Sequence, residues 1–439
     1  MKQAVILAGG QGKRLKKYSG KLPKSMVSLL GKPILQYQIE QCVANNIKNI
    51  KLLVCYQSKI IIDYFGDGSN FGASIEYIIE KQPRGTAGAL IDCLDYLDDV
   101  FLVIYGDLFF DVDLKSFWNF HKNNSSDATI FLHPNNHPYD SDLVDLNSKM
   151  RVNKIYSYPH DKSWKKNLVN AAIYILNKKK LYGLKFRKKK PDIAKNLFPL
   201  MLNQKKKISG YISTEYIRDA GTVDRFNKIK KDIKSGIVKS LKKKTKKAAI
   251  FIDRDGTINR EVNHLSHHKQ FELIKDTAKA ISKINKSGRL SIVVTNQPGI
   301  ARGDLKKNDL KVIHNKMETL LGRNGAYIDN IYYCPHHTDS GFKGEIKELK
   351  IRCKCRKPNT GMFKQAKKEL NIDFKKSWVV GDSTRDILAA KRTGMKSVLV
   401  KTGYAGKDKS YKINPDYIAK NLNEAVDLIL NKNFSYDNL

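Results

Sequence analysis

The stretch Ile250-Phe-Ile-Asp-Arg-Asp-Gly-Thr-Ile-Asn259 decides the fold of the second half of the chain. It overlaps an apolar run from Ala248 to Ile252 that predicts a short buried strand. Asp253 and Asp255 therefore emerge at the carboxyl end of a strand, where open α/β sheets bind their ligands. Because Gly256 lets the chain turn away at once, both carboxylates can project from one face. One can attack phosphorus while the other handles the proton of the leaving group.

A turn without chemistry is the alternative, because Asp and Gly are ordinary turn residues. Three later stretches favour catalysis, because they add polar or charged groups that suit a phosphoryl group and a metal ion. They are Ser291–Ile300 with Thr295 and Asn296, Arg356–Pro358 with Lys357, and Trp378–Asp386 with Asp382 and Asp386.

A cluster of cysteines and histidines lies in the same half of the chain: Cys334, His336, His337, Cys353 and Cys355. The C-x-H and C-x-C spacing fits a closed tetrahedral zinc site with three thiolates and one imidazole. Reduced thiols beside an exposed histidine are the alternative interpretation.

The net charge of +38, from 81 Lys and Arg against 43 Asp and Glu, raises the question of a nucleic-acid partner. The lysines are spread over the whole length, and no patch interleaves basic with aromatic residues. We therefore expect a solvated basic surface and no nucleic-acid partner. Such a surface would still attract phosphorylated substrates.

The remaining cysteines, Cys42, Cys55 and Cys93, are scattered through apolar surroundings, as is usual for buried thiols in a reducing compartment. No apolar run approaches the ~20 residues that span a bilayer, and the amino terminus has no signal-peptide pattern. We expect a cytoplasmic protein without a membrane partner, whose oligomeric state stays open. Its length of 439 residues allows two or three domains.

The first half opens on a predicted strand and a glycine-rich turn, Gln3-Ala-Val-Ile-Leu-Ala-Gly-Gly-Gln-Gly-Lys-Arg-Leu15. Backbone N–H groups of such a turn can hold phosphate oxygens, and Arg14 adds positive charge. The spacing is not Gly-x-Gly-x-x-Gly, which disfavours a dinucleotide fold, and the chain contains no P-loop motif.

This opening resembles the sugar-1-phosphate nucleotidyltransferases, whose motif Leu-Ala-Gly-Gly-x-Gly-x-Arg-Leu matches Leu7–Leu15. Further segments match that family in order: Leu22–Met26, Gly31–Ile34, Gln82–Leu90, Phe101–Asp107, Val169–Tyr174 and Arg218–Thr222. The resemblance implies in-line attack of a sugar-1-phosphate oxygen on the α-phosphorus of a nucleoside triphosphate, with pyrophosphate as the leaving group.

The same resemblance implies a role for each matched residue. Gly9, Gly10, Gly12, Lys13, Arg14 and Lys24 would hold the triphosphate, Gln82, Gly85 and Thr86 the nucleoside, Asp107 and Asp219 Mg²⁺, and Asn170 the sugar. Lys13 stands where the family usually has Thr. Many relatives also carry Glu-Lys-Pro before the Asn170 position, where this chain has Tyr158-Pro-His-Asp-Lys162, so Lys162 would replace that lysine.

A lysine-rich stretch separates the two halves, with six lysines in the nine residues from Lys239 to Lys247. Such a composition is typical of a solvated linker. We predict a nucleotidyltransferase domain over 1–234, a linker over 235–247 and a second domain over 248–439. Many nucleotidyltransferases continue into a β-helix of hexapeptide repeats, but no such repeat is visible in this sequence.

The order of motifs in residues 248–425 resembles the haloacid-dehalogenase-like (HAD-like) phosphatases. The resemblance implies that Asp253 forms an aspartyl-phosphate and that Asp255 acts as acid and then base. It also implies that Thr295 and Lys357 hold the phosphoryl group. Mg²⁺ would bind Asp253, the backbone carbonyl of Asp255, and Asp382, with Asp386 in support.

Within that superfamily, Cys334-Pro-His-His, Cys353-Lys-Cys-Arg-Lys-Pro358 and Gly361-Met362 resemble the zinc-containing heptose 1,7-bisphosphate phosphatases and their histidinol-phosphatase cousins. The resemblance favours His336 over His337 as the zinc ligand, and it implies substrate contacts from Asn296 and Arg356. Relatives often have Lys after the motif aspartate, where this chain has Ser383.

Together these features predict two Rossmann-like α/β domains and a bifunctional enzyme of nucleotide-activated heptose synthesis. The phosphatase would make the heptose 1-phosphate that the transferase needs, with guanine as the base by resemblance. One alternative keeps both enzymes but changes the sugar, for example to mannose, or changes the phosphatase substrate to histidinol-phosphate. A nucleic-acid 3'-end phosphatase and a scaffold without catalysis are weaker alternatives, because no P-loop kinase partner is present and every expected catalytic carboxylate remains.

Overall fold

Strand β1 (Gln3–Leu7) lies at the centre of the first sheet in the computed structural model, which describes residues 2–10, 12, 20 and 22–433. Ala4, Val5 and Ile6 point to alternate faces and are buried, because helices cover an interior parallel strand on both sides. Ala4 and Ile6 pack with one set of helices, and Val5 packs with the other. The first set is α2 (Ile34–Ala44), α3 (Ser58–Phe65) and α5 (Leu114–Asn123), and the second is α4 (Gly85–Asp92) and α6 (Phe198–Asn203).

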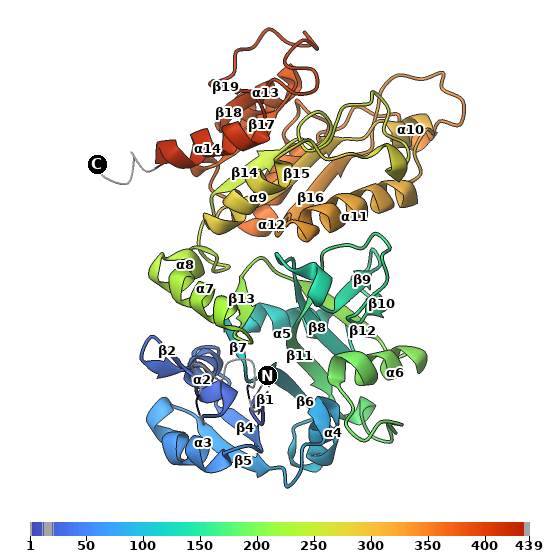
Figure 1. Ribbon diagram of the computed structural model, residues 1–439. Helices are drawn as coiled ribbons and strands as arrows, with labels where there is room; N and C mark the ends of the chain where they lie inside the picture. Colours follow the sequence, from blue (N-terminus) through green and yellow to red (C-terminus); the bar gives the residue numbers. More distant parts are fainter. Residues whose placement is uncertain (1, 11, 13–19, 21, 434–439) are drawn as a thin grey trace. The chain divides into compact units, whose positions relative to one another are not determined.

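In the described residues, nine strands form this sheet, in the order β10-β9-β11-β6-β1-β4-β5, with β8 on β11 and β12 on β8 (Figure 1). β1 pairs in parallel with β4 (Asn49–Val54) and β6 (Val100–Tyr105). The other strands are β5 (Ser74–Ile79), β8 (Ala128–His133), β9 (Leu143–Leu146), β10 (Val152–Tyr156), β11 (Val169–Asn177) and β12 (Ile208–Ile212).

A short antiparallel ladder joins β7 (Leu108–Asp111) to β13 (Tyr216–Asp219). Its register places Asp219 opposite Leu108, and the N–H of Ala220 donates to the carbonyl of Asp107 at 2.8 Å. The ladder therefore brings the chain around Asp219 next to Asp107.

The second sheet is parallel throughout and has the order β16-β15-β14-β17-β18-β19 in the described residues. Its strands are β14 (Ala249–Ile252), β15 (Leu290–Asn296), β16 (Asn330–Cys334), β17 (Trp378–Gly381), β18 (Lys396–Val400) and β19 (Tyr417–Ala419). Ile252 pairs with Val293 of β15 and with Val380 of β17. The register therefore aligns the carboxyl ends of three neighbouring strands, and the predicted catalytic side chains follow these ends.

Helices cover both faces of this second sheet. Successive residues of β14 point to opposite faces, so each face packs against its own helices. Ile250 and Ile252 share a buried cluster with α9 (Thr277–Lys286), α11 (Lys307–Arg323) and α14 (Leu422–Asn433). Phe251 packs against Phe363 of α12 (Gly361–Leu370) on the other face, with ring centroids 5.1 Å apart. Two α/β units with mainly parallel central strands confirm the predicted fold class.

The chain divides into two compact units, the first of which holds most of the residues up to Lys242. Two short segments, Pro134–Asp140 and Asp161–Asn167, group instead with the second unit. Helix α7 (Val223–Lys234) is followed by a single helical turn, α8 (Ile237–Ser240), whose Val238 is buried in the same cluster as Phe226. The start of the lysine-rich stretch is thus folded onto α7, while the domain boundaries stay a prediction.

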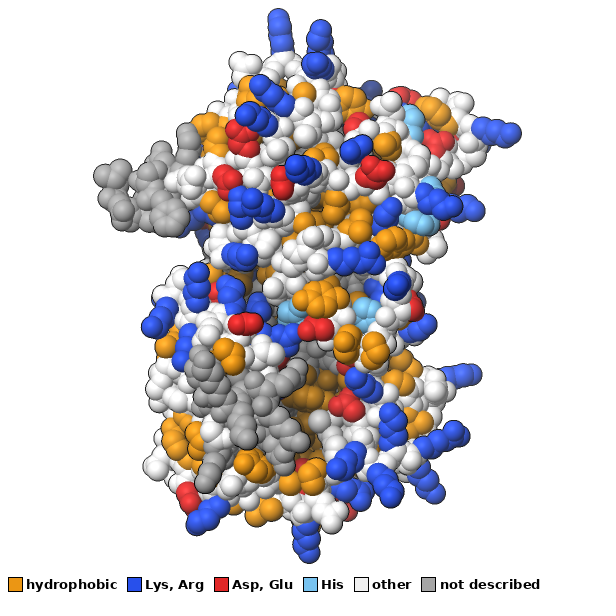
Figure 2. Space-filling view, viewed as in Figure 1, with side chains coloured by type: hydrophobic (Ala, Val, Ile, Leu, Met, Phe, Trp, Pro, Cys, Tyr) orange, Lys and Arg blue, Asp and Glu red, His pale blue; other side chains and the backbone are white. Residues whose placement is uncertain are grey.

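Lys and Arg side chains are scattered over the face of the molecule shown in Figure 2 and do not gather in one patch there. None of the described helices combines the length and the apolar character needed to cross a bilayer.

Candidate active sites

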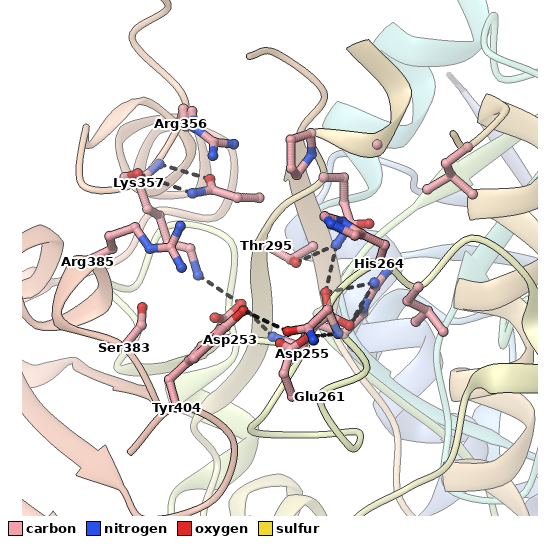
Figure 3. A pocket seen from close by; sticks show the side chains of 18 of the residues that line it. Asp253, Asp255, Glu261, His264, Thr295, Arg356, Lys357, Ser383, Arg385 and Tyr404 are labelled. Atoms are coloured by element: carbon pink, nitrogen blue, oxygen red, sulfur yellow. Dashed lines mark hydrogen bonds and ion pairs between the residues drawn. The ribbon is translucent and has the colours of Figure 1, made fainter. Parts of the chain in front are cut away.

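The second unit gathers its predicted catalytic residues around a cavity of about 230 Å³ at the carboxyl ends of β14, β15 and β17. Asp253 follows β14 directly, and Asp255 lies two residues further on (Figure 3). Gly256 has a φ of +76°, and a Cβ atom there would clash with the carboxylate of Asp382. The glycine is therefore needed both for the backbone turn and for the close approach of Asp382.

Lys357 supplies the positive charge at the base of this cavity. Its Nζ lies 2.8 Å from Asp253 Oδ1 and 2.6 Å from Asp386 Oδ1, and it donates to the carbonyl of Val294 at 2.9 Å. The side chain is 2% exposed. Burial alone would lower the pKa of Lys357, but the two carboxylates raise it, so the lysine is held charged.

Three carboxylates, Asp253, Asp382 and Asp386, offer oxygens within 4.8 Å of one another. Burial, followed by the charge of Asp386, raises the pKa of Asp253 to about 7, against the opposing effect of Lys357. Burial, followed by the charges of Asp253 and Asp386, raises the pKa of Asp382 to about 8. Buried oxygens that repel one another fit a hard divalent cation such as Mg²⁺.

Asp386 differs from the other two, because its side chain has protein partners on both oxygens. Oδ2 accepts from the hydroxyl of Ser383 at 2.8 Å and closes a capping box at the start of α13 (Thr384–Thr393), while Oδ1 faces Lys357. This leaves Asp253 and Asp382 as the side chains best placed for a cation, in line with the supporting position expected for Asp386.

Asp255 is held by side chains that the sequence analysis did not single out. Arg254, which is fully buried, donates through Nη2 to Asp255 Oδ2 at 2.8 Å. Asn259 donates to Oδ1 at 3.0 Å, and Gln297 donates to Oδ2 at 2.9 Å. Their position inside the motif Asp-Arg-Asp-Gly-Thr-Ile-Asn and directly after Asn296 was a signal for them.

His314 lies behind Arg254, with its Nε2 3.2 Å from Arg254 Nη1. Burial, followed by the charge of Arg254, holds the pKa of His314 well below its usual value. A neutral imidazole can accept a hydrogen bond from the guanidinium, so His314 supports the residue that orients Asp255.

Thr295, Asn296 and Arg356 also line the cavity. Thr295 Oγ1 accepts from Gln297 Nε2 at 2.9 Å. Asn296 exchanges hydrogen bonds with the backbone of Lys357, accepting from its N–H at 2.9 Å and donating to its carbonyl at 3.1 Å. In this structure Asn296 therefore positions Lys357 through the backbone.

The four predicted zinc ligands, Cys334, His336, Cys353 and Cys355, also come together, with donor atoms within 4.8 Å of one another. Cys334 Sγ lies 3.1 Å from Cys355 Sγ, and His336 Nδ1 lies 3.2 Å from the same sulfur. His337 is turned elsewhere, with its Nε2 3.0 Å from Arg302 Nη2. Three thiols and one imidazole are a donor set that suits zinc.

The first unit has a cavity of about 270 Å³ after β1, lined among others by the predicted residues Gly9, Gly10, Lys24, Gly85, Thr86 and Asp107. Lys24 forms an ion pair with Asp107, and its N–H donates to the carbonyl of Gly10 at 3.3 Å. Gly12 has a φ of +65°, and a Cβ atom there would press against the Lys24 side chain. Lys13 and Arg14 lie outside the described residues.

The other predicted metal residue, Asp219, is held by Arg225, whose Nη1 donates to both carboxylate oxygens at 3.0 Å. Its neighbour Ala220 contacts the backbone of Asp107, as described above. Asp107 lines the first cavity and Asp219 does not, but their backbone segments are adjacent. Carboxylate oxygens suit Mg²⁺, and substrate oxygens would complete its coordination.

Thr86 and Gln82, both expected at the nucleoside, differ in position, because Thr86 lines the first cavity and Gln82 does not. Thr86 Oγ1 donates to Asp192 at 2.9 Å and accepts from Tyr105 OH at 3.0 Å, so its hydroxyl ties α4 to the segment at Asp192. Gln82 is exposed and is not among the residues that line the cavity.

The expected sugar contacts are not gathered at this cavity. Asn170 accepts from the N–H of Ala172 at 3.0 Å and does not line the cavity. Lys162 belongs to the segment that groups with the second unit. Instead, Lys195 lies beside the residues that replace Glu-Lys-Pro, because its Nζ donates to the carbonyl of Tyr158 at 2.9 Å.

Glu80 is a further residue of the first cavity that the sequence analysis missed. It follows β5, accepts from the N–H of Arg84 at 3.3 Å, and has a carboxylate oxygen close to Gly9. Burial raises its pKa, and Asp92 adds to the effect. Its place at a strand end, directly before the loop with Gln82, was the available signal.

The two sites define the class of protein: one unit is built for transfer of a nucleotidyl group and the other for removal of a phosphoryl group. A family model for nucleotidyl transferases matches residues 3–236, and a HAD-like hydrolase model matches residues 354–425. The first match covers more than half of the chain.

Two curated relatives match the second part. A D-glycero-beta-D-manno-heptose-1,7-bisphosphate 7-phosphatase from Haemophilus ducreyi is 42% identical over 161 residues, which are 36% of this chain and 86% of the relative. The phosphatase of that name from Pasteurella multocida is 44% identical over 158 residues, or 36% of this chain and 83% of the relative. The chain thus belongs to the nucleotidyl transferase family through its first part and to the family of these phosphatases through its second.

Among solved structures, HddC from Yersinia pseudotuberculosis is 28% identical, with a TM-score of 0.47. The match covers 53% of this chain and all of HddC.

Proposed function

We propose that this chain carries out two successive steps in the synthesis of a nucleotide-activated heptose. The second unit removes the 7-phosphate of a heptose 1,7-bisphosphate, and the first unit transfers GMP from GTP to the resulting heptose 1-phosphate with release of pyrophosphate. One observation carries this proposal: a nucleotidyl transferase and a relative of heptose bisphosphate phosphatases share one chain, so the product of one reaction is the kind of substrate the other needs.

In the phosphatase step, the Asp253 carboxylate attacks phosphorus while Asp255 donates a proton to the departing sugar oxygen. Arg254, Asn259 and Gln297 hold Asp255 in place for this transfer. Water then attacks the phosphorus of the aspartyl-phosphate and Asp255 takes up its proton, so the bond to Asp253 breaks, its carboxylate is restored and inorganic phosphate leaves. An Mg²⁺ ion held by Asp253, Asp382 and the carbonyl of Asp255 would neutralise charge on the phosphoryl oxygens.

In the transfer step, no side chain needs to act as a nucleophile, because the sugar phosphate itself attacks the α-phosphorus. The backbone at Gly9, Gly10 and Gly12 and the side chains of Lys24 and Arg14 would hold the triphosphate and offset its charge. Mg²⁺ bound to Asp107 and Asp219 would stabilise the developing charge on the pyrophosphate.

Glu80 supports guanine as the base. Guanine presents two adjacent donors, N1–H and the 2-amino group, and one carboxylate can accept both. Adenine, cytosine and uracil each carry at least one acceptor on that edge, which a carboxylate repels. Glu80 lines the cavity beside Gly9, so it is placed to read a base held by the glycine turn.

We also propose that Cys334, His336, Cys353 and Cys355 bind a structural zinc ion, and that the protein acts in the cytoplasm. The four donors are gathered without a disulfide among them. The site lies directly before Arg356 and Lys357, so a closed zinc site would fix the loop that carries both cations.

The test is an assay with purified protein and Mg²⁺ in which heptose 1,7-bisphosphate is offered with GTP, ATP, CTP or UTP in turn. Phosphate and pyrophosphate are followed separately. We expect phosphate with every nucleotide and pyrophosphate with GTP alone. Pyrophosphate with another nucleotide only would contradict the base assignment, and failure to release phosphate would contradict the phosphatase assignment.

A further inference from the structure

The residue that follows Asp382 does not supply charge to the phosphatase cavity. Ser383 is uncharged, and its hydroxyl donates to Asp386 Oδ2 at 2.8 Å to cap α13. A substrate with two phosphate groups places a second dianion in this cavity, away from the Asp253 nucleophile. Another positively charged side chain is therefore needed to bind the second phosphate group.

Arg385 lies two residues further along α13 and lines the same cavity as Ser383 (Figure 3). Its side chain is 31% exposed, and its described ion pair is long, with Nε 4.0 Å from Asp408 Oδ2. Asp408 is already satisfied by Thr384, which donates to it from its N–H at 2.8 Å and its hydroxyl at 2.7 Å. Within the described part of the chain, the guanidinium of Arg385 has no hydrogen bond.

Arg356 reaches the same side of the cavity from the loop after Cys355, as Figure 3 shows. Its Nη1 donates weakly to the carbonyl of His336 at 3.4 Å, and none of the described carboxylates forms an ion pair with it. Arg356, Arg385 and Arg302 all line this cavity, so their positive charges lie near one another. Guanidinium groups that repel one another without a carboxylate between them favour binding of an anion.

Lys357, the lysine at the catalytic end of the cavity, already has carboxylate partners. Lys357 is buried between Asp253 and Asp386, where it serves the phosphoryl group under attack. Arg302 contacts His337, and its guanidinium carbon lies 4.8 Å from the centre of the Phe342 ring. It therefore adds to the positive electrostatic potential of the cavity more than it offers a direct contact to substrate. Among the described arginines that line the cavity, Arg254 is bound to Asp255 and Arg302 contacts His337, which leaves Arg385 and Arg356 to face substrate.

We propose that Arg385 binds, together with Arg356, the phosphate group that is not transferred, and so selects sugar bisphosphates over monophosphates. Arg385 would supply, from the first turn of α13, the positive charge that Ser383 does not provide. The fork of a guanidinium suits the oxygens of a phosphate dianion. This inference rests on the proposed phosphatase function and names the part of its substrate that the cavity reads.

The test compares Arg385→Ala and the milder Arg385→Gln with Lys391→Ala, which removes one charge from an exposed position of the same helix. The substrates are heptose 1,7-bisphosphate with heptose 7-phosphate, and fructose 1,6-bisphosphate with fructose 6-phosphate. Both Arg385 variants should raise the KM for bisphosphates by about 10- to 100-fold, the usual loss for a hydrogen bond to a charged group. Values of kcat, and all constants for monophosphates, should match those of Lys391→Ala.

Equal losses on bisphosphates and monophosphates would overturn the assignment of Arg385 and leave the phosphatase intact. An unchanged KM for bisphosphates in both variants would overturn it as well. A wild-type enzyme that prefers fructose 1,6-bisphosphate would replace the heptose of the proposed function but would still test Arg385. A wild-type enzyme with no preference for either bisphosphate would overturn both proposals.

Discussion

The two candidate sites differ in how far their charged side chains are shielded from solvent. In the second unit, the side chains of Lys357 and Asp386 are 2% and 0% exposed and that of Asp253 is 14% exposed, and Lys357 pairs with both carboxylates. In the first unit, the side chains of Lys24 and Asp107 keep 15% and 26% of their exposure, and that of Asp219 keeps 28%. A carboxylate that must attack phosphorus gains reactivity from desolvation, whereas a site that only positions two substrates can stay open to water.

The largest expected effect isolates the second site. Asp253→Asn removes the attacking carboxylate and should lower phosphate release by at least about 1,000-fold, while pyrophosphate release from GTP and heptose 1-phosphate stays near normal. Both rates are measured on the same preparation, with circular dichroism as the control for folding. Loss of both activities in a folded variant would show that the sites are not independent.

The reciprocal change is Asp107→Ala. It removes a proposed Mg²⁺ ligand of the first unit and should lower pyrophosphate release by at least about 100-fold without changing phosphate release. Lys32→Ala, which breaks an exposed ion pair with Glu40 at the surface of the same unit, is the control. Pyrophosphate release that persists in Asp107→Ala would refute the metal assignment.

A third prediction compares how much Lys357 and Lys24 contribute to the free energy of unfolding. Lys357→Ala leaves Asp253 and Asp386 facing each other without their buried cation, so the free energy of unfolding should fall by about 3–5 kcal/mol. Lys24→Ala breaks a more exposed pair and should cost less than about 1 kcal/mol. Urea unfolding without divalent cations measures both, and equal costs would remove the contrast between the sites.

The smallest effect concerns a histidine that lines neither cavity. Burial lowers the pKa of His121 to about 4, and its Nδ1 lies 2.8 Å from Thr129 Oγ1. The unfolded chain takes up a proton near pH 6.5 and the folded unit does not, so stability present above that pH is lost as the pH falls towards 4. The loss from pH 6.5 to 5.5 should be about 1 kcal/mol in urea unfolding, and His121→Gln should lack it.

Much of the fold could be predicted from local sequence. The apolar runs of β1 and β14, each followed by glycine or aspartate, mark interior parallel strands and the ends at which ligands bind. The helical turn at Val238 could not be predicted, because six nearby lysines hide one apolar contact with α7. Composition describes the solvated side of a segment better than its buried side.

The candidate sites were predictable where a motif carries its own chemistry. The cysteine and histidine spacing is one example, and the choice of His336 over His337 agrees with their positions in the structure. The sequence did not predict Arg254, Glu80 and Arg385 as site residues, because a charged residue is identified as functional only when its partners in space are known. Thr86, which the motif predicts at the first site, lines that cavity and also holds Asp192 through its hydroxyl.

The most direct test of two linked reactions follows each phosphate of one substrate. Heptose 1,7-bisphosphate carrying ³²P at position 7 or at position 1 is incubated with the protein, Mg²⁺ and GTP. The account predicts that label from position 7 appears as inorganic phosphate and that label from position 1 is retained in the nucleotide-linked heptose. Release of the position 1 label as inorganic phosphate would contradict it, because the transferase would then lose its substrate.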